Sequence, residues 1–497
     1  MVFKMKFLSK SLLILLTTIL KVNTDVVPSS VIIVGAGSSG LATASRLFQN
    51  GFNNIKILEA ENRIGGRVYT TKFNDYFVDL GAQWVHGENI VFDMAWSLGL
   101  LERSTVRNYS NSMFDSSGKQ VDQTVINDFY DFYYKTEKKL SHCATKYTNV
   151  TVGKFFTDEF NKYFDIHPNF KENEKGLFQL LDMMQSVWQS SDSWLDISST
   201  SISEYHSSTG DFLMNWKENG YGTVLELLTK QYPNPKEELP IINNTILNTE
   251  VTLIDYSKSD EKIMVQTSNG EIFSADHVIV TCSLGVLKDR HHSMFKPSLP
   301  KRKQKTIEAL EFGNVGKIFL SFEEYWWTKE TVFLDFLWKD EDFEMIVNEP
   351  EKNWLLGLIG FETVEHKPKL LEGWVSGKYS REMEKLTEEQ VKNHCIEVIE
   401  RFLGKTYNVT KPTEIIRTTW NSNNHFKGTY SFRNMKSDAK SVWAETLAEP
   451  IDKTKLMILF AGEATNKHHF GTVHGAIESG YREADRLIKF YSELTTN

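Results

Sequence analysis

A strand, a glycine-rich turn and a helix follow one another near the start of the chain, and they constrain the fold more than any other feature. Residues 31–34 form a continuous run of β-branched apolar residues, which is typical of a buried parallel strand. The motif Gly-Ala-Gly-Ser-Ser-Gly follows at 35–40, and apolar residues then recur at helical spacing up to Asn50. A second strand at 55–58 ends at Glu59. This order predicts a βαβ unit that binds a dinucleotide.

Each glycine of the motif has its own physical role. Gly35 allows the tight turn, Gly37 lets a pyrophosphate approach the backbone, and Gly40 lets the helix pack closely on the strand. Free N–H groups at the start of the helix offer partial positive charge to the phosphates. Glu59 is placed to accept hydrogen bonds from a ribose. The motif by itself leaves FAD and NAD as alternatives.

Length, charge and cysteine content bound the class of protein. A chain of 497 residues is expected to form two domains. The net charge of −9 argues against nucleic acid as a partner, because such proteins usually carry a basic patch. Three cysteines exclude a disulfide framework.

The N-terminus has the pattern of a secretory signal peptide, which we predict for residues 1–24. Three lysines within the first ten residues precede an apolar run at 12–20, and small or polar residues follow at 22–24. An uncleaved anchor and a disordered tail are the alternatives. The mature chain is then expected to be secreted, with no membrane span. Four asparagines that begin glycosylation sequons agree with secretion: Asn108, Asn149, Asn243 and Asn408.

The segment after Glu59 favours FAD over NAD. Residues 59–67 read Glu-Ala-Glu-Asn-Arg-Ile-Gly-Gly-Arg, and they resemble the extension that follows the second strand in glutathione-reductase-like FAD proteins. Arg63 or Arg67 is placed to bring a guanidinium to the pyrophosphate, and we assign Arg67 to the cofactor. An exposed basic loop is the alternative.

Later blocks resemble the flavin-containing amine oxidases, a family that includes monoamine oxidases, polyamine oxidases and histone lysine demethylases. The matching blocks include 80–87, 283–288, 312–322, 460–465 and 471–476. The resemblance implies oxidation of a small-molecule amine by O2. Monoamine oxidases bond their flavin to a Cys, and this chain has none after Cys395, so its FAD is expected to be non-covalent.

The resemblance also implies the architecture, which belongs to the α/β class. A discontinuous glutathione-reductase-like, Rossmann-type FAD-binding domain is expected from residues 26–105, 216–300 and 415–497. An α+β substrate-binding domain is expected from 106–215 and 301–414. Within the second insertion, 332–338 and 354–361 read as strands and 388–402 as a charged helix.

Contacts to FAD are implied for several positions that match family blocks. The block at 80–87 passes beside the flavin ring, and the backbone at Val251 holds the adenine. The segment around Trp420 lines the substrate side of the flavin. Glu463 meets the ribityl or phosphate region, and a helix near Val473 points its N-terminus at the flavin. The implied cofactor residues not yet named are Gly81, Ala82, Gln83, Trp84 and Thr472.

Lys317 and His86 are the predicted catalytic residues. Lys317 interrupts an apolar strand, where a lysine needs a partner, and the matching family lysine holds a water at flavin N5. An edge-strand lysine facing solvent is the alternative. His86 resembles the histidine of animal spermine and acetylpolyamine oxidases, and we also assign it to the substrate. A histidine in a satisfied loop is its alternative.

A polyamine is the predicted substrate. Tyr430 matches an aromatic wall that packs along a methylene chain. Thr472 replaces the tyrosine of plant polyamine oxidases, and Gly471 replaces a serine that holds a substrate nitrogen in animal spermine oxidases. We assign both to the substrate pocket. Glu204 is assigned as an acidic contact to an ammonium group, with a solvated loop as the alternative.

The predicted reaction turns spermine, N1-acetylspermine or spermidine into an aldehyde, a shorter amine and hydrogen peroxide, and the cofactor carries the chemistry. Two other functions stay open. One is an L-amino-acid oxidase or another amine oxidase of the same family. The other is a catalytically impaired flavoprotein that acts as a binding protein.

Overall fold

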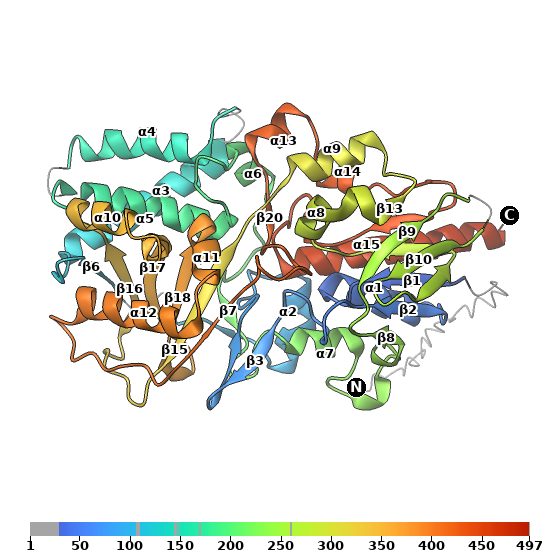
Figure 1. Cartoon of the computed structure of the whole chain (residues 1–497), viewed down its shortest axis with the longest axis horizontal. Coiled ribbons are helices and arrows are strands. Elements are labelled where there is room, and N and C mark those ends of the chain that lie inside the picture. The colour runs from blue at the N-terminus through green and yellow to red at the C-terminus, as the bar shows by residue number, and fades with distance from the viewer. Residues whose placement is uncertain are drawn as a thin grey trace, which may run out of the picture.

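The computed structural model describes residues 29–496, apart from 106–109, 144–146, 148, 168–169 and 259–260. The predicted signal peptide and the Asn108 sequon lie outside the described residues. Two halves lie side by side along the long axis of the molecule (Figure 1). None of the described helices is long and apolar enough to cross a membrane.

A five-stranded parallel sheet forms the centre of the half that contains both described ends of the chain (Figure 1). Its strands pair in the order β21-β12-β1-β2-β8. Their bounds are β1 (Val31–Val34), β2 (Ile55–Leu58), β8 (Thr245–Ile246), β12 (His277–Val280) and β21 (Ile458–Phe460). The predicted βαβ start is confirmed, since β1 and β2 flank α1 (Ser38–Gln49).

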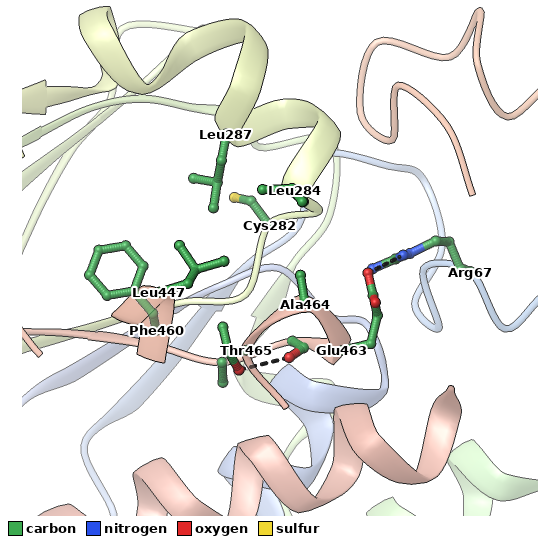
Figure 2. A pocket seen from close by; sticks show the side chains of 11 residues that line it. Arg67, Cys282, Leu284, Leu287, Leu447, Phe460, Glu463, Ala464 and Thr465 are labelled. Carbon is green, nitrogen blue, oxygen red and sulfur yellow. Dashed lines mark hydrogen bonds and ion pairs between the residues drawn. The ribbon is translucent and has the colours of Figure 1, made fainter. Parts of the chain in front are cut away.

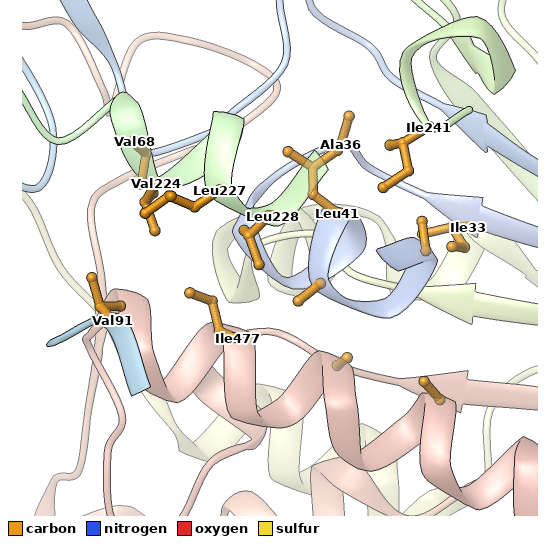
Figure 3. Close-up of a cluster of buried hydrophobic side chains, with 14 of the residues drawn as sticks. Ile33, Ala36, Leu41, Val68, Val91, Val224, Leu227, Leu228, Ile241 and Ile477 are labelled. Atoms are coloured by element: carbon orange, nitrogen blue, oxygen red, sulfur yellow. The ribbon is translucent and has the colours of Figure 1, made fainter. Parts of the chain in front are cut away.

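Alternate residues of β1 pack on opposite faces of this sheet. Val31 and Ile33 join a core with α1, α7 (Thr223–Thr229) and α15 (Val473–Thr496). Figure 3 shows side chains of these helices in this core, among them Leu41, Leu228 and Ile477. The opposite face, with Ile32 and Val34, packs against a second sheet and α8 (Leu284–Met294). That sheet is ordered β11-β10-β9-β13, with bounds β9 (Val251–Asp255), β10 (Ile263–Thr267), β11 (Ile272–Ala275) and β13 (Phe295–Lys296).

The other half is built on a six-stranded mixed sheet in the order β19-β15-β18-β17-β16-β6. The strands are β6 (Ser110–Asp115), β15 (Val315–Ser321), β16 (Thr331–Leu337), β17 (Leu358–Val364), β18 (Lys367–Ser376) and β19 (Glu414–Arg417). One face packs against α12 (Glu388–Leu403), and the other packs against α3 (Gln123–Cys143) and α5 (Glu174–Gln189), with α4 (Val152–Phe164) outside them (Figure 1).

The two halves agree with the predicted fold class, a Rossmann-type domain plus an α+β domain. The domain boundaries remain a prediction. The predicted boundary at 415 lies within β19, which pairs with β15 and therefore belongs to the six-stranded sheet. The helix predicted at 388–402 is present as α12. The strand predicted at 354–361 starts too early, because residues 353–357 form the 3-10 helix η7 (Asn353–Gly357).

Candidate active site

The turn between β1 and α1 is shaped for close approach. Gly35 has a φ of 104°, in the region that favours glycine. A Cβ on Gly40 would overlap the carbonyl oxygen of Gly35, so helix and strand pack on that glycine. A Cβ on Gly37 would meet nothing nearer than the Cα of Gly66 at 3.9 Å. Protein packing therefore does not require a glycine at 37, which leaves the approach of a ligand as the physical reason for it.

Two alanine variants separate these roles. Gly37→Ala is expected to fold, because Gly37 has a φ of −73° and room for a Cβ, but to lose bound flavin. Gly40→Ala is expected to lower the unfolding free energy by about 1–3 kcal/mol through overpacking. Melting temperature and flavin content of the two purified variants test this. Equal flavin content in the wild type and Gly37→Ala would contradict the assignment.

The remaining parts of a dinucleotide site surround this turn. The N-terminus of α1 has no capping side chain, so its N–H groups are available to phosphate. Glu59 is buried at the end of β2, where its Oε2 accepts from the N–H of Ala36 at 2.6 Å and its Oε1 from that of Glu61 at 2.8 Å. Burial raises the pKa of Glu59. Each oxygen keeps a second lone pair that is able to accept from a ribose hydroxyl.

Arg67 and Glu463, both predicted to contact the cofactor, lie against each other. Arg67 Nη1 is 2.9 Å from Glu463 Oε1 and donates to the carbonyl of Thr429 at 2.6 Å. Figure 2 shows this pair beside a small cavity. The cavity is lined by residues that follow β12 and β21, including Cys282, and it lies at the carboxyl ends of the parallel strands, where open α/β sheets bind ligands. The glycine turn, the uncapped helix and Glu59 together fit a dinucleotide such as FAD.

The other predicted cofactor residues lie on several elements. Val251 begins β9, and Val473 begins α15. Thr472 caps α15, accepting from the N–H of Gly475 at 3.0 Å through its hydroxyl. Trp420 is buried, and its Nε1 donates to the carbonyl of Leu80 at 3.0 Å. Trp420 is thereby tied to the segment that carries Gly81, Ala82, Gln83 and Trp84, all of which are half-buried.

Lys317 is buried on β15, so the solvent-facing alternative is wrong. Its Nζ donates to the carbonyl of Asp79 at 3.0 Å and to Gln83 Oε1, and it lies 3.2 Å from Glu372 Oε1. Gln83 Nε2 also donates to Glu372 Oε2 at 2.8 Å, which closes the cluster. The Lys317 and Glu372 side chains are 4% and 0% exposed. A buried ion pair thus lies beside Gln83, one of the predicted flavin-contacting residues.

Aromatic and acidic side chains lie next to Lys317 on the same face of the six-stranded sheet. Lys317 Nζ lies 4.3 Å from the centroid of the Trp374 ring, and Trp374 stacks on Trp84 with ring centroids 5.9 Å apart. Trp374 Nε1 donates to Glu362 Oε1 at 2.8 Å. Burial raises the pKa of Glu362 to about 8, with the neighbouring Glu372 carboxylate as the next cause.

The sequence interpretation missed Glu372, Trp374 and Glu362. Glu372 stands in the run Leu-Leu-Glu-Gly-Trp-Val at 370–375, where an acid in an apolar strand requires a partner. The same signal singled out Lys317. The sequence does not show that β15, β18 and β17 are neighbours, so the pairing of these residues was not visible.

His86 is half-buried, in the same segment as Gln83. Its Nδ1 lies 3.0 Å from the carbonyl oxygen of Phe212, and its ring stacks on the Phe212 ring. Burial lowers the pKa of His86, which favours the neutral imidazole. Asn89 Nδ2 donates to the His86 carbonyl and lies 3.4 Å from His474 Nδ1, which links this segment to the first turn of α15.

Two of the predicted substrate contacts, Tyr430 and Gly471, lie against each other, whereas Glu204 is paired with another residue. Tyr430 donates its hydroxyl to the carbonyl of Val187, and Gly471 lies against its ring, with a Cβ position 3.4 Å from Tyr430 Cδ2. Gly471 has a φ of 71°, which explains a glycine there. Glu204 is already paired with the buried guanidinium of Arg433, which leaves it less available to an ammonium group.

Comparison with known proteins agrees with this geometry. The family model described as flavin containing amine oxidoreductase matches residues 38–488. The probable polyamine oxidase 5 of Arabidopsis thaliana is 27% identical, and the alignment covers 93% of this chain and 98% of that protein. The peroxisomal N(1)-acetyl-spermine/spermidine oxidase of Bos taurus is 28% identical, with 93% of this chain and 95% of that protein covered.

A solved structure extends the likeness to the fold. A double mutant of putrescine oxidase, redesigned in its cofactor binding, superposes with a TM-score of 0.67 at 17% identity and covers 93% of this chain and 99% of its own. The family match spans most of the chain, and the turn after β1 and the buried Lys317 lie inside it. The protein belongs to the flavin-containing amine oxidoreductases and is an amine oxidase that uses a flavin.

Proposed function

We propose that the protein oxidises polyamines, with non-covalent FAD as its cofactor, and gives an aldehyde, a shorter amine and hydrogen peroxide. The observation that carries the proposal is the buried cluster of Lys317, Gln83 and Glu372 beside the stacked rings of Trp84 and Trp374. The names of relatives that match over nearly the whole chain support the same substrate class.

The chain's residues have distinct tasks in this reaction. Gly37, Glu59 and the N-termini of α1 and α15 would hold FAD, which would supply a hydride acceptor for the carbon next to the amine nitrogen and reactivity toward O2. Trp84 and Trp374 offer apolar faces to a methylene chain beside Lys317. Lys317 is expected to hold a water at the flavin.

An L-amino-acid oxidase is the second candidate, and it requires an arginine for the substrate carboxylate. Three arginines near the predicted cofactor and substrate residues already have side-chain or backbone partners in the structure. Arg67 pairs with Glu463, Arg433 with Glu204 and Asp438, and Arg417 donates to two backbone carbonyls. These contacts favour an amine without a carboxylate. The buried Lys317 likewise argues against a flavoprotein that has lost turnover.

Peroxide release by the purified mature chain tests the proposed substrate. We expect peroxide with spermine, N1-acetylspermine or spermidine and none with L-leucine or benzylamine, and the order of rates identifies the preferred polyamine. Peroxide with L-leucine alone would contradict the polyamine proposal and leave the family intact. Failure of every amine to reduce the flavin would support the binding-protein alternative.

The FAD is expected to be released intact when the protein is denatured. Cys395 is fully buried on α12, packed in the core of the six-stranded sheet away from the glycine turn, and Cys282 lies beside the small cavity with its pKa raised by burial to about 12. A thiol held protonated in this way is a poor nucleophile toward a flavin. Acid precipitation followed by absorbance of the supernatant measures the release. Flavin that stays with the precipitated protein would contradict non-covalent binding.

We also propose that the protein enters the secretory pathway. Asn149, Asn243 and Asn408 are exposed, so each sequon is accessible to glycosylation. Expression in a eukaryotic host is expected to place a glycosylated protein in the medium, with an N-terminus near residue 25. Intracellular retention with an intact N-terminus would contradict the proposal.

A further inference from the structure

Two adjacent histidines lie at the end of α8, close to an acid of the neighbouring helix. His291 and His292 are in the last turn of α8, and Glu308 is in the last turn of α9 (Lys301–Ala309), which packs against α8 (Figure 1). One ligand atom from each of the three side chains lies within 4.8 Å of the other two. Within the described part of the chain, no other group of three His, Cys, Asp or Glu side chains has this spacing.

The hydrogen bonding of His291 leaves one ring nitrogen available to a ligand. His291 is 3% exposed, and its Nδ1 lies 2.8 Å from the carbonyl oxygen of Leu287, one turn back along α8. A carbonyl oxygen only accepts, so Nδ1 carries the proton, and in the neutral ring Nε2 carries the lone pair. Nε2 is fully buried and has no hydrogen-bond partner among the described residues. Metal-bound histidines have this arrangement, in which one nitrogen donates to a carbonyl and the other binds the ion.

His292 and Glu308 are exposed, so their side chains can adjust around an ion beside His291. The two imidazole rings have centroids 3.8 Å apart and are tilted by 39°. Zinc bonds of about 2.0–2.2 Å to nitrogen and carboxylate oxygen place the ligand atoms of a tetrahedral site about 3.3 Å apart. Because the three ligand atoms already lie within 4.8 Å of one another, a shift of the two exposed side chains completes this geometry without moving His291.

Lys288 fixes the two helix ends relative to each other. Its Nζ donates to three carbonyls at the end of α9, those of Ile307, Glu308 and Leu310, at 3.3, 3.2 and 2.6 Å. The Glu311 carboxylate lies 3.6 Å from the same ammonium group and offsets part of its charge. The backbone that carries the three ligands is therefore positioned in advance, and an ion has to order only two exposed side chains.

We propose that His291, His292 and Glu308 bind a divalent transition-metal ion, with Zn²⁺ as the ion that fits two imidazoles and one carboxylate. His291 Nε2 supplies the fixed ligand, and water completes the coordination on the exposed side. Ca²⁺ and Mg²⁺ are not expected, because they take oxygen ligands. The ion links the ends of α8 and α9 and stabilises the half of the molecule that contains the glycine turn. This inference is independent of the proposed amine oxidation.

Zinc titration of the purified, untagged, flavin-loaded protein tests the site after treatment with a chelator and dialysis. We expect one Zn²⁺ per chain and a melting temperature about 2–3 °C higher at a hundredfold excess over the dissociation constant. Glu308→Gln and His292→Ala change exposed side chains, so both variants are expected to fold. Each should weaken zinc binding by at least about tenfold, since loss of an outer-shell partner alone costs that much.

His142→Ala is the matched control for these variants. His142 is an exposed histidine in the last turn of α3, and its Nδ1 lies 2.8 Å from the Lys138 carbonyl oxygen, the same contact that His291 makes with its own helix. It belongs to no three-residue ligand group in the described part of the chain, so its loss should leave zinc affinity unchanged. A wild type that binds no Zn²⁺, or that binds it no more tightly than Glu308→Gln and His292→Ala, would overturn the metal site and leave His291 as a helix-capping residue.

Discussion

The variant Lys317→Met is expected to slow the flavin chemistry by about 100-fold or more, the range found when one preorganised electrostatic group is removed from an active site. Lys317 Nζ lies among Asp79 O, Gln83 Oε1 and Glu372 Oε1, on the face of the sheet that carries Trp374. Methionine keeps most of the volume and loses the charge. Stopped-flow measurement of flavin reduction and of reoxidation by O2 separates the two half-reactions.

A double variant distinguishes chemistry from stability in this experiment. Lys317→Met alone leaves Glu372 buried without its partner, which is expected to destabilise the fold by about 3–5 kcal/mol. Lys317→Met combined with Glu372→Gln removes both charges and should recover much of that stability while the rate stays low. Unchanged rates in the single variant, or rates that recover with stability in the double variant, would remove the catalytic assignment of Lys317.

Glu372→Gln is expected to lower kcat by about tenfold or more while changing KM less than about twofold. The Glu372 carboxylate is the counter-charge of Lys317 and also accepts from Gln83 Nε2, so its loss lets the Lys317 ammonium group move from its position. A stability loss of about 3 kcal/mol is also expected, since one partner of a buried pair is removed.

The kcat and KM of the flavin-loaded variant, measured with flavin content and melting temperature, test this positioning role. A purely structural role for Glu372 would lower the melting temperature and leave kcat per bound flavin unchanged. Glu414→Gln serves as the control, because that carboxylate is exposed. A kcat per bound flavin equal to that of the wild type would contradict the role of Glu372 as the residue that positions Lys317.

The parts of the molecule that were predictable from sequence are those set by local pattern. The turn from β1 to α1 was predicted because glycine spacing and apolar runs determine it within a short segment. The early start predicted for β17 has a local cause as well. Trp354 and the two leucines after it are a buried apolar run that resembles a strand, but they form a 3-10 turn.

The parts that depend on distant pairing were not predictable. Lys317 stood out as a polar residue in an apolar strand, yet its partner Glu372 became identifiable only from the register of β15 with β18. Glu204 was expected to face the substrate because nothing in its own segment indicated the pairing with Arg433. In both cases the missing information was which segments lie side by side, and a single sequence does not specify that.

Anaerobic titration tests most directly whether this chain binds a flavin and uses it to oxidise an amine. Spermine or spermidine is added to the purified, flavin-loaded protein without O2, and the absorbance of the oxidised flavin is followed. The band is expected to bleach with a saturable dependence on polyamine and to return when O2 is admitted, with release of hydrogen peroxide. A bound flavin that no amine bleaches would contradict it.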